Sequence, residues 1–176
     1  MIKYYPAWII IVYGQTHKGE LMTYNDILRR IRYALNIDDT TMIEIFGLVG
    51  HVIEQSLLIS LLTKEGEPGY VSCSSRVLGY FLDGLIVHKR GRKETGPDGQ
   101  QRREPHLTHN AILKKLRIAL ELQEEDMLDV LKLADIHISK AELTALFRKE
   151  GNKNYKECGD QFLRNFLKGL SIRYRA

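Results

Sequence analysis

The sequence predicts an all-α protein built from two homologous four-helix repeats, and three observations lead to this fold class. Residues 23–90 align with residues 108–175 at an offset of 85 positions without a gap, and 23 of the 68 pairs are identical. Apolar residues recur at helical spacing through both copies. No window shows sustained alternation of apolar and polar positions rich in β-branched residues, so almost no sheet is expected. The chain is therefore read as a tandem duplication of a small helical unit.

The first two helices of each repeat are predicted from apolar faces and start signals. In the first helix, apolar residues fall on one face of an α-helix in both copies: Ile27, Leu28, Ile31, Ala34 and Leu35, repeated as Ile112, Leu113, Leu116, Ala119 and Leu120. Thr23 with Asp26 is typical of a capping box, although Asn25 is an alternative cap. The second helix is expected to open at 38–41 and again at 124–126, where acidic residues suit a helix N-terminus.

The third and fourth helices complete each repeat. Ser139 and Glu142 form a capping-box pattern, and Gly151 follows the predicted end of the third helix. The fourth helix carries a broad apolar stripe in both copies: Val77, Leu78, Phe81, Leu82 and Leu85, then Phe162, Leu163, Phe166, Leu167 and Leu170. Small repeats bury such stripes better against each other than alone. We therefore expect the two repeats to pack face to face with pseudo-two-fold symmetry.

The duplication divides the chain into a non-repeat segment at 1–21, repeat 1 at 22–90, a linker at 91–106 and repeat 2 at 107–176. The apolar run at 7–13 is far shorter than the about 20 residues that span a membrane. We expect Met22 to be the natural start, with 1–21 an over-extended reading frame; a short strand or tail clipped onto the helical body is the alternative. Gly, Pro and charged residues from His88 to His106 predict a flexible, exposed and basic linker.

The composition favours an ordinary globular protein of the cytosol. The net charge is +4, with repeat 1 (23–90) at −1 and residues 91–176 at +4, a balance that permits nucleic-acid binding without requiring it. The two cysteines, Cys73 and Cys158, occupy equivalent positions and do not suggest a disulfide scaffold. Each is expected to be a small packed apolar group. The alternative is a thiol whose pKa is lowered by the helix that starts just after it.

Several short segments of the sequence resemble those of a known protein family. The segments 114–119, 153–155 and 157–170 in repeat 2, with 25–28, 67–70, 84–86 and 88–91 in repeat 1, resemble the bacterial YehS-like proteins. The resemblance covers residues 22 to 175. It implies a tandemly repeated domain of unknown function from a bacterial cytoplasm, and it transfers no catalytic residue.

A search for chemistry-bearing motifs predicts no enzyme. The sequence has no glycine-rich phosphate loop, no dinucleotide-binding fingerprint and no nucleophile elbow. The six histidines and two cysteines lack the spacing of a zinc site. We therefore expect no catalytic residue, no cofactor and no metal ion.

Basic residues recur on the first helix of each repeat and suggest a nucleic-acid interface. The candidate residues are Arg29, Arg30 and Arg32, their copies Lys114, Lys115 and Arg117, and the linker residues Arg92 and Lys93. Such a surface would attract phosphate groups. The alternative is a solvated helix face whose cations pair with Asp26, Glu121 or other local acids. A weaker indication is the helix-turn-helix layout of residues 125–149.

From the sequence we therefore expect a cytoplasmic binding or adaptor protein without catalytic activity. The leading expectation is recognition of a protein or peptide partner in the groove between the repeats. The alternative is binding of RNA or DNA through the basic helix faces and the linker. No membrane partner is expected.

Overall fold

A computed structural model describes residues 21–92 and 107–175, and within these ranges all regular structure is helical. The expectations for 1–20 and for 93–106, including Lys93, lie outside the described residues. Each repeat has four helices, in agreement with the predicted all-α class. They are α2 (Tyr24–Ala34), α3 (Asp39–Gly47), α4 (Gln55–Leu62) and α5 (Ser75–Arg90), then α6 (His109–Ala119), α7 (Glu124–Leu133), α8 (Lys140–Ala145) and α9 (Asp160–Arg175).

Local side-chain caps fix where these helices begin. Thr23 and Asp26 form the predicted capping box of α2, and Ser139 and Glu142 form that of α8. Asn25 does not cap α2, so that alternative was wrong; its side chain has another role, described below. Helix α5 continues through Arg90, so the stretch from His88 that we assigned to the linker begins as helix.

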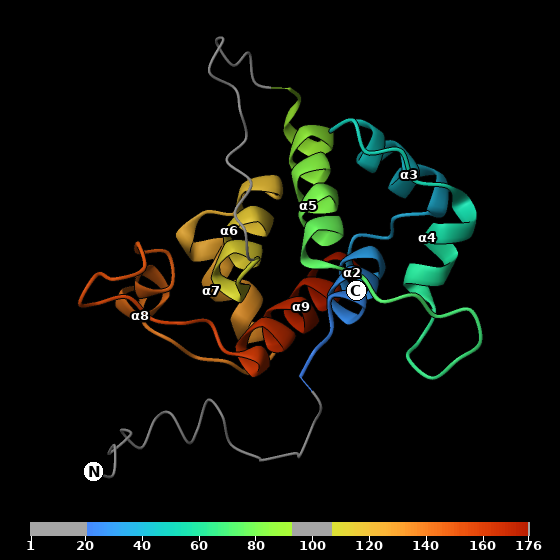
Figure 1. Cartoon of the computed structure of the whole chain (residues 1–176). Coiled ribbons are helices and arrows are strands. Elements are labelled where there is room, and N and C mark those ends of the chain that lie inside the picture. Colours follow the sequence, from blue (N-terminus) through green and yellow to red (C-terminus); the bar gives the residue numbers. More distant parts are fainter. Residues whose placement is uncertain (1–20, 93–106, 176) are drawn as a thin grey trace.

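The two repeats share one hydrophobic core. A single cluster of buried side chains runs through all eight helices, from Met22 to Leu170. Within each repeat, the second helix packs on the fourth: α3 on α5, and α7 on α9. The first helix of each repeat instead packs mainly against the fourth helix of the other repeat, α2 on α9 and α6 on α5. Figure 1 shows α5 beside α6 at the centre, with α3 and α4 on one side and α7 and α8 on the other.

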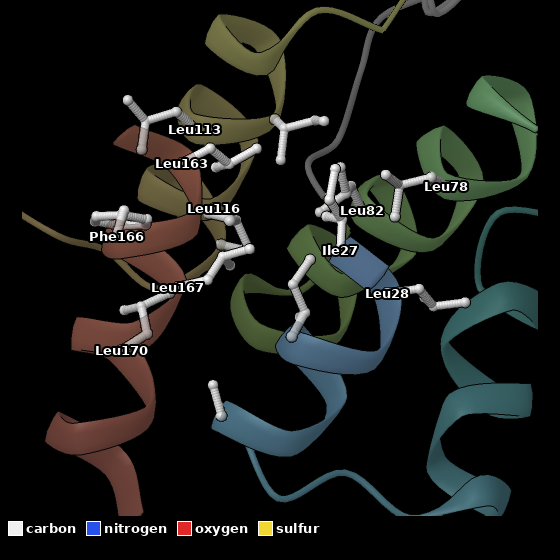
Figure 2. Close-up of a cluster of buried hydrophobic side chains, with 14 of the residues drawn as sticks. Ile27, Leu28, Leu78, Leu82, Leu113, Leu116, Leu163, Phe166, Leu167 and Leu170 are labelled. Carbon is white, nitrogen blue, oxygen red and sulfur yellow. The ribbon is translucent and has the colours of Figure 1, made fainter. Parts of the chain in front are cut away.

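This exchange of first helices explains why each repeat needs the other. Ile27 and Leu28 of α2 are fully buried, as are Leu163, Phe166 and Leu167 of α9. Figure 2 shows the side chains of α2, α5, α6 and α9 converging on one interior. A repeat on its own would expose most of the apolar face of its first helix to water. The pairings are equivalent in the two copies; pseudo-two-fold symmetry of the whole arrangement stays a prediction.

Two glycines set the distance between the second and fourth helices of each repeat. A Cβ added at Gly84 would lie 2.0 Å from the carbonyl oxygen of Ile45, and one added at Gly169 would lie 2.0 Å from that of Val130. Real Cβ atoms do not approach an oxygen so closely, and the atom met is backbone, which cannot swing aside. These are equivalent positions of the duplication, so the close helix contact explains why both copies have glycine there.

Candidate functional site

A hollow of about 440 Å³ lies at the seam between the repeats, where the N-terminal ends of α2 and α6 meet the segments that lead into α5 and α9. Both repeats contribute to its walls. The Tyr24 hydroxyl donates a hydrogen bond across it to the Leu107 carbonyl oxygen, at 3.2 Å. We call this hollow the seam groove. Its lining comprises Leu21, Met22, Thr23, Tyr24, Ser72, Cys73, Leu107, Thr108, His109, Asn110, Glu150, Tyr155, Glu157 and Cys158.

Two buried asparagines hold the walls of the seam groove in place. The Asn25 amide donates to the carbonyl oxygens of Leu61 and Val71, and its side-chain oxygen accepts from the backbone N–H of Cys73 at 2.8 Å. Asn110 makes the same three bonds, to Leu146, Lys156 and Cys158. Each asparagine thus ties its first helix to the end of the third and to the start of the fourth. Because unpaired buried polar groups are costly, this network fixes the backbone around each cysteine.

The two halves of the seam groove differ at a repeated tyrosine. In repeat 1 the Tyr70 hydroxyl donates to the Asn25 side-chain oxygen at 3.2 Å, and Tyr70 is not part of the lining. Its copy Tyr155 lines the seam groove, and within the described ranges its hydroxyl makes no matching bond to Asn110. Burial raises the pKa of the Tyr155 hydroxyl, and the carboxylates of Glu150 and Glu157 raise it further. The phenol of Tyr155 therefore shares the seam groove with two acids that act on it electrostatically.

The charge of the seam groove also comes from repeat 2. Among the residues that the structure describes, its lining contains two carboxylates, Glu150 and Glu157, and no lysine or arginine. Position 72, the copy of Glu157, is serine, and Glu65, the copy of Glu150, lies outside the lining. On a chain with a net charge of +4, the seam groove is thus an acidic feature. Comparison of the two copies could have indicated part of this feature, because the negative charge of Glu157 is absent from its copy, Ser72.

The cysteines behave as packed apolar groups, as expected. Burial raises the pKa of the Cys73 thiol to about 11 and, with some help from the charges of Asp160 and Glu157, that of Cys158 to about 12. The alternative of a thiol pKa lowered by the following helix was wrong, because desolvation outweighs the helix start. Both thiols are protonated at neutral pH and are poor nucleophiles.

We expect the thiols of the folded chain to react with iodoacetamide at pH 8 only as fast as the chain unfolds. In a guanidinium-unfolded sample, whose thiols have a pKa of about 8.5, both thiols should be labelled at once.

The raised pKa of the two thiols also adds stability that is complete below pH 8.5 and is lost as the pH rises towards 11 to 12. Chemical unfolding at pH 8 and pH 10 should show this fall, and Cys158→Ala should flatten it. Rapid labelling of the folded chain would contradict the buried placement.

The predicted basic residues of α2 are engaged within the protein. Arg29 pairs with Asp26 and donates to the Thr63 carbonyl oxygen at 2.8 Å. Arg32 pairs with Asp39 at 2.6 Å, and its Nε donates to the Ile37 carbonyl oxygen. Arg30 is half-buried, and burial together with the nearby charge of Arg164 lowers its pKa. The alternative of pairing with local acids thus holds for Arg29, which pairs with the expected Asp26, and for Arg32, whose partner Asp39 had not been named from the sequence.

The equivalent basic residues of α6 have fewer acidic partners among the described residues. Lys115 pairs with Asp83 of α5, an ion pair between the repeats. The Nε of Arg117 donates to the Leu122 carbonyl oxygen at 3.2 Å, as Arg32 does to Ile37, and its guanidinium lies 4.9 Å from the centre of the Phe147 ring. Lys114 is exposed and pairs with no acid in the described part of the chain. Arg92 donates to the Leu48 carbonyl oxygen. That these residues bind nucleic acid stays a prediction.

The helix-turn-helix layout finds little support in the structure. The would-be recognition helix, α8, is only 6 residues long, and residues 134–139 separate it from α7. A DNA-reading helix-turn-helix joins its helices by a shorter turn. Lys140, at the start of α8, pairs with Glu124 and Glu125 of α7.

Over the described ranges, no cluster of three or more metal-ligating side chains occurs. In the same ranges, no helix has the length and apolar character needed to cross a bilayer.

Comparison with known proteins agrees with the duplicated architecture. The model of a family described as a protein of unknown function (DUF1456) matches twice, at residues 24–91 and 109–176. The uncharacterized protein YehS of Escherichia coli K12 is 42% identical over 153 residues, which cover 86% of this chain and 96% of that protein. No solved structure is similar. Two matches that together take in most of the chain, with a relative this similar along nearly its whole length, show that the protein belongs to the DUF1456 family of tandem-repeat, YehS-like proteins.

Proposed function

We propose that this protein is a non-catalytic binding protein that holds a segment of a partner protein in the seam groove. The observation that carries the proposal is the make-up of this hollow: both repeats contribute to its walls, and its described lining residues include two carboxylates and no lysine or arginine. A hollow of about 440 Å³ falls within the range of ligand sites in proteins. The protonated state of both thiols supports a binding role rather than a nucleophilic one.

The chemistry of the seam groove favours a segment that carries a lysine or arginine. Glu150 and Glu157 line the seam groove together with Tyr155, so a cationic group bound there would be attracted by two carboxylates and an aromatic ring. Glu150 and Glu157 are both exposed, so each ion pair would add about 1 kcal/mol or less. The acids therefore select the partner, and contact with Leu21, the exposed apolar side chain of the lining, supplies most of the affinity.

The test uses the full chain and a random decapeptide display library. We expect enrichment of peptides that contain lysine or arginine, with affinities measured by fluorescence anisotropy on labelled copies. Glu150→Gln and Glu157→Gln should each weaken binding about three- to fivefold, and Tyr155→Ala should weaken it further. Glu65→Gln is the matched control, because it removes the same charge at the copy of position 150 outside the seam groove.

Two results would count against the proposal. One is a library that yields no enriched sequence. The other is a set of enriched peptides whose affinity falls as much with Glu65→Gln as with Glu150→Gln, which would indicate non-specific electrostatic attraction to surface carboxylates.

Nucleic-acid binding is the second candidate, and it is favoured by Lys114, which is exposed and pairs with no acid among the described residues. An electrophoretic mobility shift with mixed RNA and DNA at two salt concentrations tests it. If it holds, the shift should weaken at the higher salt and be lost when Arg29, Arg30, Lys114 and Lys115 are all replaced by glutamine. A shift that survives these changes, or no shift at low salt, would remove this candidate.

A further inference from the structure

The structure contains a pair of equivalent hollows, one in each half of the fold. One, of about 410 Å³, lies beside α2, and the other, of about 300 Å³, lies beside α6. We call them the α2 hollow and the α6 hollow. Every residue that lines the α2 hollow has its copy, 85 positions away, in the lining of the α6 hollow. The duplication has therefore preserved a concave surface as well as a core.

Each hollow is built across the seam and carries three cations. The first helix of one repeat supplies two of these cations. The last residue of the fourth helix of the other repeat supplies the third. In the α2 hollow these are Arg29, Arg32 and Arg175; in the α6 hollow they are Lys114, Arg117 and Arg90. The third cation is brought in by the exchange of first helices, since α2 packs on α9 and α6 on α5.

The two hollows differ in how far these cations are neutralised. In the α2 hollow Arg29 pairs with Asp26, and Arg32 pairs with Asp39. Arg175 donates to the Tyr33 carbonyl oxygen and to the Asn36 side chain, and its guanidinium lies over the Tyr33 ring at 4.2 Å. Three cations thus face two carboxylates, and each is committed to an internal partner.

Neither of these two ion pairs has a counterpart in the α6 hollow. The copy of Asp26 is Ala111, and the copy of Asp39 is Glu124, which pairs with Lys140 of α8 instead. Glu121 is the one acid among the described residues of the lining. It lies 3.4 Å from Arg90, in a pair whose side chains are 68% and 46% exposed and which is therefore weak. The ends of two helices, each with about half a negative charge, border both hollows alike, so they do not alter the comparison.

We propose that the α6 hollow is a binding site for a phosphate group. Arg90, Lys114 and Arg117 surround it with N–H donors that are largely uncommitted in the described structure, and the Phe147 ring holds the Arg117 guanidinium in place. Guanidinium and ammonium groups together suit the oxygens of a phosphate. The same chemistry would accept a free phosphate or nucleotide and the backbone of a nucleic acid. The site does not depend on peptide binding in the seam groove.

The experiment titrates the full chain with pyrophosphate and, separately, with a labelled single-stranded RNA. Calorimetry follows the first and fluorescence anisotropy the second. We expect binding of at least one probe, with backbone amide NMR shifts at Lys114 and Leu122 and much smaller shifts at their copies Arg29 and Ile37. Binding of pyrophosphate identifies a site for a free phosphate compound; binding of RNA alone identifies a nucleic-acid backbone.

Paired variants separate the site from general electrostatic attraction. The double variant Arg90→Gln with Lys114→Gln should weaken binding about tenfold or more. The control, Arg175→Gln with Arg29→Gln, removes the same charge at the copied positions and should change affinity less than about twofold. Glu121→Asn installs the residue found at the copied position 36, removes the one carboxylate of the lining and should tighten binding.

Three results would overturn the proposal. The first is that neither probe binds. The second is equal loss of affinity in the two double variants, which would show that overall charge alone governs binding. The third is unchanged or weaker binding by a folded Glu121→Asn variant. Circular dichroism of each variant confirms that it is folded.

Discussion

Gly169→Ala should destabilise the protein by about 3 kcal/mol or more, and Gly84→Ala should do the same. The added methyl group would lie 2.0 Å from the backbone oxygen of Val130 in the first case and of Ile45 in the second. No rotamer change relieves a clash with backbone, so α9 must move away from α7, or α5 from α3. That movement would also loosen the buried side chains between them. Chemical unfolding followed by circular dichroism measures the loss.

The control for both glycines is Gly79→Ala. Gly79 lies on α5, the helix that also carries Gly84. A Cβ at Gly79 meets no atom within 4 Å, and its φ is not in the left-handed region. Alanine is a better helix former than glycine, so this change should stabilise the fold by about 0.5–1 kcal/mol. If Gly84→Ala and Gly79→Ala had similar effects, the close contact between α5 and α3 would be wrong.

Phe166→Ala should cost about 3–5 kcal/mol. Phe166 is fully buried on α9, within the cluster drawn in Figure 2, and alanine would leave a cavity that rigid neighbouring helices cannot fill. Phe81, its copy, also packs on the Phe46 ring at 5.5 Å, so Phe81→Ala should cost at least as much. Chemical unfolding gives both values.

Lys168→Ala is the control for Phe166→Ala, because Lys168 is exposed on the same helix and its loss should change stability by less than about 0.5 kcal/mol. A measured loss below about 1 kcal/mol for Phe166→Ala would show that the apolar stripe of α9 does not face the core.

Local signals in the sequence were enough to predict the helices. Capping boxes such as Ser139 with Glu142 act over a single turn, and the apolar stripe of the fourth helix needs no knowledge of its neighbours. The pairing of helices could not be predicted in this way. Ile27 and its copy Ile112 present equivalent faces, so a first helix could bury the same stripe on the fourth helix of either repeat. Only the three-dimensional arrangement shows that the first helices are exchanged.

The roles of individual polar residues were also beyond the sequence. Asn25 sits near a helix start and resembles a cap, yet it bonds to backbone groups 36 to 48 positions away. Arg32 and Arg117 resemble free cations, yet each donates to the carbonyl oxygen five positions later. The partners in these bonds are backbone atoms. Every residue has them, so the residue types do not show which one is used. Glu157 could have been noticed, since its copy is Ser72 and a new charge at a repeated position needs a reason.

The exchange of first helices is the feature on which the core, the seam groove and both basic hollows depend. Producing residues 22–92 and 107–176 as separate chains tests it most directly, by size-exclusion chromatography with light scattering and by thermal unfolding. We expect neither fragment to be a monomer with a cooperative transition, because each would expose the apolar face of its first helix. Mixing them should give a one-to-one complex that unfolds cooperatively. A monomeric fragment that unfolds cooperatively by itself, and does not bind the other, would contradict the exchange.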